Sequence, residues 1–140
     1  MANKFVKILG LLLALFALHA SAADKLKVVY HLTELERVPF VIGNIENHIK
    51  GVGGPENVEI ILVVHGPALK AFEKSNTDPK LLDRLGLLKT KGLEFDACGN
   101  TLQKEKLNIT DLADGFVKVD QGGVVRIAEL QHAGYIYIRP

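Results

Sequence analysis

Apolar residues follow two alternating patterns along this chain. Runs rich in β-branched and aromatic residues predict five strands, at 26–32, 58–64, 93–96, 116–119 and 135–138. The run at 58–64 has no polar face, which is typical of a central parallel strand. Between the runs, apolar residues recur at helical spacing, as Val41, Ile45 and Ile49 do. The alternation predicts an α/β fold: a single-domain α/β/α sandwich around a five-stranded, mostly parallel sheet of unspecified strand order.

Prolines and capping residues indicate where several helices begin. Pro39 fits only in the first turn of its helix, and Pro67 suits the first turn of a helix that runs to about Phe72. Asp78, which a proline follows, is expected to cap the next helix. Asp120 is expected to cap the last helix of the chain.

The first 22 residues have the pattern of a secretory signal peptide. Lys4 and Lys7 precede an apolar run at 8–18, and the small residues at 20–22 form a cleavage pattern. The run is too short for a membrane span of about 20 residues. We therefore expect cleavage after residue 22, no stable membrane anchor afterwards, and a periplasmic or secreted domain of residues 23–140; an uncleaved anchor is the alternative.

Charge and cysteine content narrow the possible functions. The formal net charge is +1, and it becomes −1 when Lys4 and Lys7 are removed with the leader. The chain has no basic stripe or arginine cluster, so nucleic-acid binding is not expected. Its single cysteine cannot form an internal disulfide. The thiol is therefore free, metal-bound, modified or bridged to another chain.

That cysteine, Cys98, comes where an expected strand turns into a helix. Gly99 can adopt the backbone angles of a tight turn, and Asn100 is expected to cap the helix, with Gln103 completing a capping box. The free amides at a helix start favour thiolate over thiol. Gly99 and Asn100 are thus expected to bind whatever Cys98 carries; inert packing of a buried cysteine is the alternative.

Two histidines also follow expected strands. His31 ends the first strand and His65 ends the second, while Cys98 follows the third. Ligands of open α/β sheets bind beyond the carboxyl ends of the strands. If the three strands are neighbours, these side chains converge; taken alone, each histidine more often has a structural role. His48 and His132 are expected at the surface or in helix packing.

Four stretches of the chain together resemble DsrE/DsrF-like proteins: 28–32, 63–69, 95–102 and 130–140. The resemblance implies a DsrE-like α/β/α domain that assembles into trimers or hexamers. In sulfur-relay members it also implies a cysteine that carries sulfur as a persulfide, and only Cys98 matches that position. We accordingly expect a homo-oligomer, most simply a trimer.

Other chemistries lack their motifs. Residues 51–54 are rich in glycine but follow a helix, so they form a helix end rather than a phosphate loop. The sequence contains no CxxC or HExxH motif, and Ser75 lies in a polar loop rather than at a nucleophile elbow. We expect neither a cofactor nor a resident metal.

Two functions from different classes remain open. In the first, the protein is an exported sulfur carrier or sulfurtransferase: Cys98 binds sulfane sulfur as a persulfide, and His65 or His31 assists proton transfer. Its partners are then a sulfur donor or acceptor protein or a small sulfur compound, and whether it is an enzyme stays open. In the second, it is a noncatalytic periplasmic protein that binds a small ligand or a soft metal with His31, His65 and Cys98.

Overall fold

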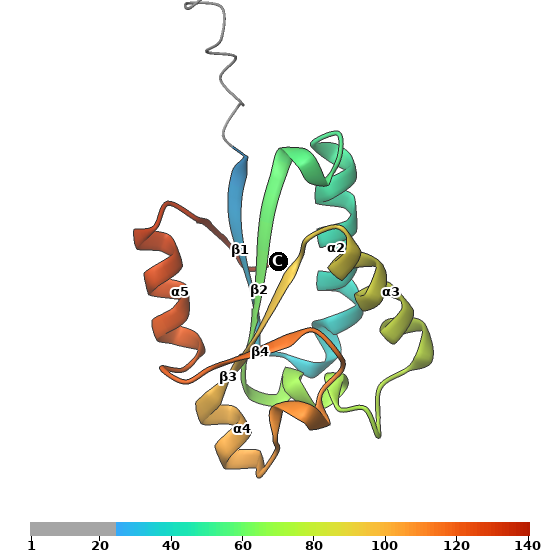
Figure 1. The fold of residues 1–140 in the computed structure, drawn as a ribbon, viewed down its shortest axis with the longest axis vertical. Coiled ribbons are helices and arrows are strands. Elements are labelled where there is room, and N and C mark those ends of the chain that lie inside the picture. The colour runs from blue at the N-terminus through green and yellow to red at the C-terminus, as the bar shows by residue number, and fades with distance from the viewer. Residues whose placement is uncertain (1–24) are drawn as a thin grey trace, which may run out of the picture.

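A computed structural model describes residues 25–140 of the chain. The expected signal peptide, residues 1–22, lies outside the described residues. Within residues 25–140, no helix combines the length and the apolar character needed to cross a membrane. The described part of the chain forms a twisted sheet with helices on both faces (Figure 1).

The five expected strands are all confirmed. They are β1 (Leu26–Leu32), β2 (Val58–Val64), β3 (Glu94–Cys98), β4 (Phe116–Val119) and β5 (Ile136–Ile138). The α-helices of residues 25–140 are α2 (Val38–Gly51), α3 (Pro79–Thr90), α4 (Gly99–Glu105) and α5 (Gly123–His132). Short 3-10 helices are η1 (Leu35–Arg37), η2 (Pro55–Asn57), η3 (Gly66–Phe72) and η4 (Ile109–Asp111).

The sheet is parallel throughout, with the strand order β4-β3-β2-β1-β5. This confirms the expected α/β fold and supplies the strand order that the sequence pattern left open. The ends of the three central strands are in register, because Leu32 pairs with Val64 and Val64 pairs with Ala97. The residues that follow, or lie next to, these pairs therefore reach the same edge of the sheet.

One face of the sheet carries the main hydrophobic core. Alternate residues of a strand point to the same face, so Val28, Tyr30 and Leu32 of β1 all point toward α2. Helix α2 meets them with an apolar stripe at helical spacing, formed by Val38, Val41, Ile42, Ile45 and Ile49. Helix α3 and η3 complete this layer and contribute the buried Leu85, Leu88, Leu69 and Phe72.

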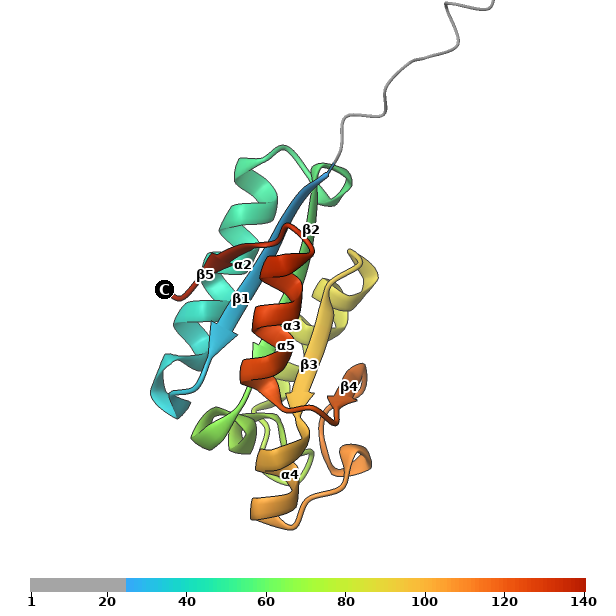
Figure 2. The ribbon, with the colours of Figure 1, turned by 90° about the vertical axis from the view of Figure 1, so that its left-hand side faces the viewer.

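The other face is covered within residues 25–140 by α5, which contacts β1, β2, β3 and β5 (Figures 1 and 2). Its apolar core is small and consists of Val29, Ile61, Val63, Ile127 and Leu130. Polar residues fill much of the remaining area: Glu94 and Asp96 point to this face from β3, and Glu59 does so from β2. This face is therefore the less apolar of the two, and it leads directly to the strand ends.

The expected helix starts were only partly right. Asp78 caps α3 as expected, since its Oδ1 accepts from the Lys80 amide at 2.8 Å. Pro67 opens η3, which is a 3-10 helix rather than an α-helix and ends at the expected Phe72.

Two expected caps were wrong, and glycines explain both. Helix α4 already begins at Gly99, so Cys98 is its N-cap and Asn100 lies inside the helix. A Cβ on Gly99 would lie 2.8 Å from the Val119 carbonyl oxygen, so only glycine lets this helix start against the end of β4. Helix α5 is capped by Gly122, whose φ of 90° favours glycine, whereas Asp120 pairs with Lys118.

Candidate functional site

Cys98 lies at the carboxyl edge of the sheet, where β3 ends and α4 begins. Its side chain is 5% exposed and unpaired as a thiol. Two helix starts meet at this point, because α5 begins at Gly123 and a Cβ there would lie 3.4 Å from the Cβ of Cys98. The sequence predicted one helix start beside Cys98, and the structure has two, those of α4 and α5.

Polar groups from two helix starts surround the sulfur of Cys98. The Gly66 amide donates to Oγ1 of Thr101 at 3.0 Å, so the hydroxyl of Thr101 is oriented with its own proton free to donate to the sulfur. The backbone amides of Gly123, Thr101 and Asn100, at the starts of α5 and α4, also lower the pKa of the Cys98 thiol. Burial raises the pKa of the Cys98 thiol, but these donors outweigh it and hold the pKa below its ordinary value.

Thr101 was not among the predicted site residues. It lies three residues after Cys98, which is one helical turn, and its side chain can therefore reach back over the start of α4. A hydroxyl residue at this spacing after a cysteine at a helix start is a signal that could have indicated it.

Two glycines at the start of α5 pack against the expected site residues. A Cβ on Gly123 would lie 3.2 Å from Cδ2 of His65, and a Cβ on Gly122 would lie 2.5 Å from Nδ2 of Asn100 and 3.9 Å from Sγ of Cys98. The side chain of Asn100 thus lies beside the sulfur although it does not cap the helix. Gly99 follows Cys98 directly, and its lack of a side chain lets the start of α4 approach the end of β4 closely.

The two histidines meet end to end, as neighbouring strands allow. Nε2 of His31 lies 2.6 Å from Nε2 of His65, and Nδ1 of His31 lies 2.7 Å from the hydroxyl of Tyr137. The ring centres are 4.7 Å apart and the planes are inclined by 23°, so the two rings are close to parallel. Tyr137, His31 and His65 therefore form one hydrogen-bonded chain across β5, β1 and β2.

Both histidines are neutral near pH 7. Burial, then the charges of His65 and Arg139, lower the pKa of His31 to about 4. Burial, then the charge of Arg139, lowers the pKa of His65 below its ordinary value. Each ring then carries one proton, so one histidine donates to the other and the direction can reverse.

The histidines flank the sulfur without touching it. Within residues 25–140, no hydrogen bond joins either histidine to Cys98, and the Cδ2 edge of His65 faces Gly123. Residues 25–140 also contain no group of three or more histidine, cysteine, aspartate and glutamate side chains arranged to hold a metal ion. His48 bonds instead to the hydroxyl of Tyr30 at 2.9 Å, which is the expected helix packing.

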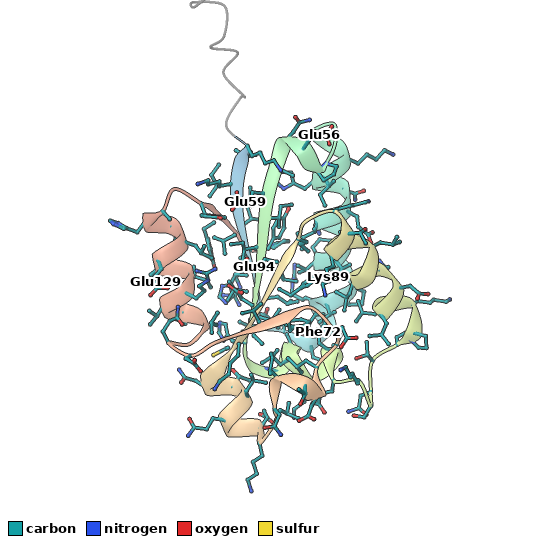
Figure 3. The ribbon with its side chains drawn as sticks, viewed as in Figure 1. Glu56, Glu59, Phe72, Lys89, Glu94 and Glu129 are labelled. Atoms are coloured by element: carbon teal, nitrogen blue, oxygen red, sulfur yellow. The ribbon has the colours of Figure 1, made fainter. Side chains whose placement is uncertain are left out.

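An ionic cluster between α5 and the sheet was not predicted. Arg126 of α5 donates from Nε to Oδ2 of Asp96 at 2.7 Å and from Nη2 to Oε1 of Glu94 at 2.9 Å. Asp96 is 0% exposed, and burial raises its pKa to about 6. In Figure 3, Glu59 and Glu94 lie on the α5 side of the sheet and Phe72 lies on the opposite side. The signal for this cluster was a pair of acids at alternate positions of an apolar strand.

Hollows open on both sides of the site. One, of about 420 Å³, is polar and is lined by Gly99, Asn100, Gln103, Lys118 and Asp120. The other, of about 290 Å³, is lined by His31, Val124, Ile127, Ala128, Gln131 and Tyr137. A small molecule or a partner side chain thus has room beside both the cysteine and the histidine chain.

Comparison with known proteins identifies the family. The sequence model of the DsrE/DsrF-like family matches residues 11–140. The chain therefore belongs to the DsrE/DsrF-like family, as its motifs indicated. Membership suggests a function of the sulfur-relay type and, at the same coarse level, partner proteins of a sulfur relay.

Solved structures of the same fold agree with this assignment. The protein of unknown function MTH1491 from Methanobacterium thermoautotrophicum is similar at 28% identity and a TM-score of 0.72, over 83% of this chain and 100% of its own. The ychN protein from E. coli is similar at 12% identity and a TM-score of 0.63, over 82% of this chain and 100% of its own. No curated protein matches the chain.

Proposed function

We propose that this protein is an exported sulfur carrier in which Cys98 accepts sulfane sulfur and holds it as a persulfide. The observation that carries the proposal is the position of Cys98: it caps α4, the start of α5 packs against it, and the hydroxyl of Thr101 lies one helical turn further on. These surroundings favour the thiolate, which is the nucleophilic form. Membership of a family with sulfur-relay functions supports the same chemistry.

The transfer is an exchange between sulfur atoms. The thiolate of Cys98 attacks the outer sulfur of a donor persulfide, a new S–S bond forms, and the S–S bond of the donor breaks. The donor leaves as a thiolate that takes up one proton, and no net oxidation occurs. In the second half, the thiolate of an acceptor attacks the outer sulfur on Cys98 and regenerates its thiolate.

We propose that the histidine chain supplies the proton that the leaving donor thiolate takes up. A neutral chain of Tyr137, His31 and His65 can release a proton at one end and take one up at the other while both rings switch tautomer. Because His65 faces Gly123 rather than the sulfur, the chain serves the departing or arriving thiol rather than Cys98 itself.

We further propose export and self-association. Export rests on the basic start, apolar run and small residues of positions 1–22. Self-association, with a trimer favoured, is supported by exposed apolar side chains on both edge strands and at the start of α5, among them Val117 of β4, Ile136 of β5 and Val124. N-terminal sequencing of the exported protein and light scattering over a range of concentrations test these two points.

Intact-mass analysis tests the sulfur chemistry. Incubation with polysulfide, or with a persulfide donor, is expected to add sulfur in steps of about 32 Da, reversible by a thiol reductant. Cys98→Ser should abolish the addition, and His132→Gln, at an exposed histidine outside the site, should not change it. A folded protein whose Cys98 takes up no sulfur would overturn the carrier proposal and favour noncatalytic ligand binding by the same pocket.

A further inference from the structure

The groups beside Cys98 differ in how the chain holds them. Asn100 and Thr101 follow Cys98 in the sequence, so local geometry at the start of α4 keeps their amides near it. Gly123 belongs to α5, and it lies against Cys98 only if the start of α5 is held against the end of β3. The position of α5 is therefore a separate requirement of the site.

The apolar contacts of α5 lie away from its start. Ile127 and Leu130 pack on Val29, Ile61 and Val63, one and two turns after Gly123. By contrast, Val124 and Val125, next to Gly123, are both exposed. Hydrophobic packing therefore anchors the middle of the helix more firmly than the turn that faces Cys98.

Arg126 attaches the first turn of α5 to β3. Its amide donates to the Gly122 carbonyl at 3.1 Å, so it belongs to the same turn as Gly123. Its guanidinium binds Asp96 and Glu94, and Asp96 lies two residues before Cys98 on the same face of β3. The cluster thus ties the turn that carries the Gly123 amide to the strand that carries the sulfur.

We propose that Arg126 is a positioning residue: its forked grip on Asp96 and Glu94 holds the first turn of α5, which carries Gly123, against Cys98. The inference rests on the proposed function for its purpose, because a well-placed amide matters for a thiolate or persulfide. A guanidinium fits this task better than an ammonium, since it has several donors in fixed directions and can bind two carboxylates at once.

The burial of Asp96 favours the same assignment. Its Oδ2 is bound by Arg126, while its Oδ1 has no hydrogen-bond partner among the described residues. A buried carboxylate with a bare oxygen is a costly way to add stability, since apolar residues of similar size often do as well. Holding two elements in a fixed relation is a use that apolar packing does not replace.

The test is a matched pair of charge-conserving substitutions. Arg126→Lys keeps the positive charge but loses the fork, and Arg84→Lys makes the same change in a pair between α3 and α2, where Arg84 donates to Glu46 at 2.8 Å from both Nε and Nη2. The pKa of Cys98 is measured from the pH dependence of its alkylation rate. Hydrogen exchange of the Gly123 amide is measured on the same samples.

We expect Arg126→Lys to raise the thiol pKa by about 0.5 to 1 unit and to speed exchange at Gly123, while Arg84→Lys changes neither. If both variants leave the thiol pKa and Gly123 exchange unchanged, Arg126 is only a structural residue and the inference fails. Should Arg126→Lys not fold, Glu94→Gln, which weakens one arm of the grip at a more exposed residue, replaces it with the same expected direction.

The outcomes separate this inference from the carrier proposal. If Arg126→Lys shifts the thiol pKa but the unsubstituted protein takes up no sulfur, the positioning role stands and the carrier proposal fails. If sulfur uptake occurs and the thiol pKa is the same in all three proteins, the carrier proposal stands and the positioning role fails.

Discussion

The two faces of the sheet are built from the same strands but serve different ends. On β2, Ile60, Leu62 and Val64 point into the main core, while the residues between them lead to His65 on the α5 side. On β3, Phe95 and Ala97 point into that core, whereas Glu94, Asp96 and Cys98 point to the α5 side. Because strand residues alternate between faces, one strand can supply stability on one side and chemistry on the other.

The α5 side of the sheet has less apolar cover than the main core. Two helices and η3 cover the main core, but within residues 25–140 a single α-helix covers the other face, over a small apolar cluster. Regions with few buried apolar contacts open more easily. The α5 side is therefore expected to be the less stable one, and polar contacts contribute more to holding its elements in place.

Matched core substitutions give the largest expected difference between the faces. Ile45→Ala in α2 should lower the free energy of unfolding by about 4 kcal/mol, and Ile127→Ala in α5 by about 2 kcal/mol, because the site at Ile127 has fewer neighbours and collapses more easily. Chemical denaturation measures both. Alkylation of the folded variants should show a raised Cys98 pKa for Ile127→Ala alone; a change in Ile45→Ala as well would remove the distinction between the faces.

The pH dependence of Asp96 gives the next effect. Its pKa is raised from 3.8 to about 6 by burial, so between those values the folded protein keeps a proton that the unfolded chain has lost. Raising the pH through this window therefore reduces stability. Relative to the unsubstituted protein, Asp96→Asn should gain about 2–3 kcal/mol between pH 4 and pH 7.

Denaturation curves at several pH values check this prediction. The histidines titrate in both proteins, so the lowered pKa of His31 cancels in the difference. A difference that does not depend on pH would mean that Asp96 titrates normally. The α5 side of the sheet would then not differ from the main core in the pH dependence of its stability.

Glycine substitutions give the smallest effect and the sharpest contrast. An added methyl at Gly123 would press on His65 and Cys98, so Gly123→Ala should cost about 1–2 kcal/mol and slow sulfur uptake. At Gly86 in α3, nothing lies within 4 Å of the added Cβ, and Gly86→Ala should stabilise the helix by up to about 1 kcal/mol. Thermal unfolding and sulfur loading measure the pair, and opposite signs in stability are the expected result.

Much of the fold was readable from local patterns. The five strands, the parallel sheet and the cap at Asp78 follow from features within a few residues of each element. The convergence of His31, His65 and Cys98 followed from a general rule about strand ends, once β1, β2 and β3 proved to be neighbours. The strand order itself depends on how whole elements pack, and the sequence pattern alone does not specify it.

The contribution of α5 to the site was hidden for the same reason. Asn100 looked like a cap because its chemistry suits one, but the close approach of Gly99 to β4 moved the helix start forward. Gly123 and Arg126 reach Cys98 and Asp96 from about 25–30 residues away, and nothing in the local sequence signals those contacts. The adjacent glycines at 122 and 123 were the one visible hint of a tight contact.

The parallel sheet also determines at which end of the described chain a label or a surface can be coupled without blocking the site. Strand β1 starts at Leu26, at the edge of the sheet opposite Cys98 (Figure 1). With seven residues, β1 separates the two edges by about 20 Å. The other terminus lies beside the histidines, because Arg139 bonds to Thr33 and Glu34 just after β1. A fluorophore, resin or chip coupled ahead of Lys25 would leave the cysteine edge facing open solution, whereas the same group after Pro140 would crowd His31 and Tyr137.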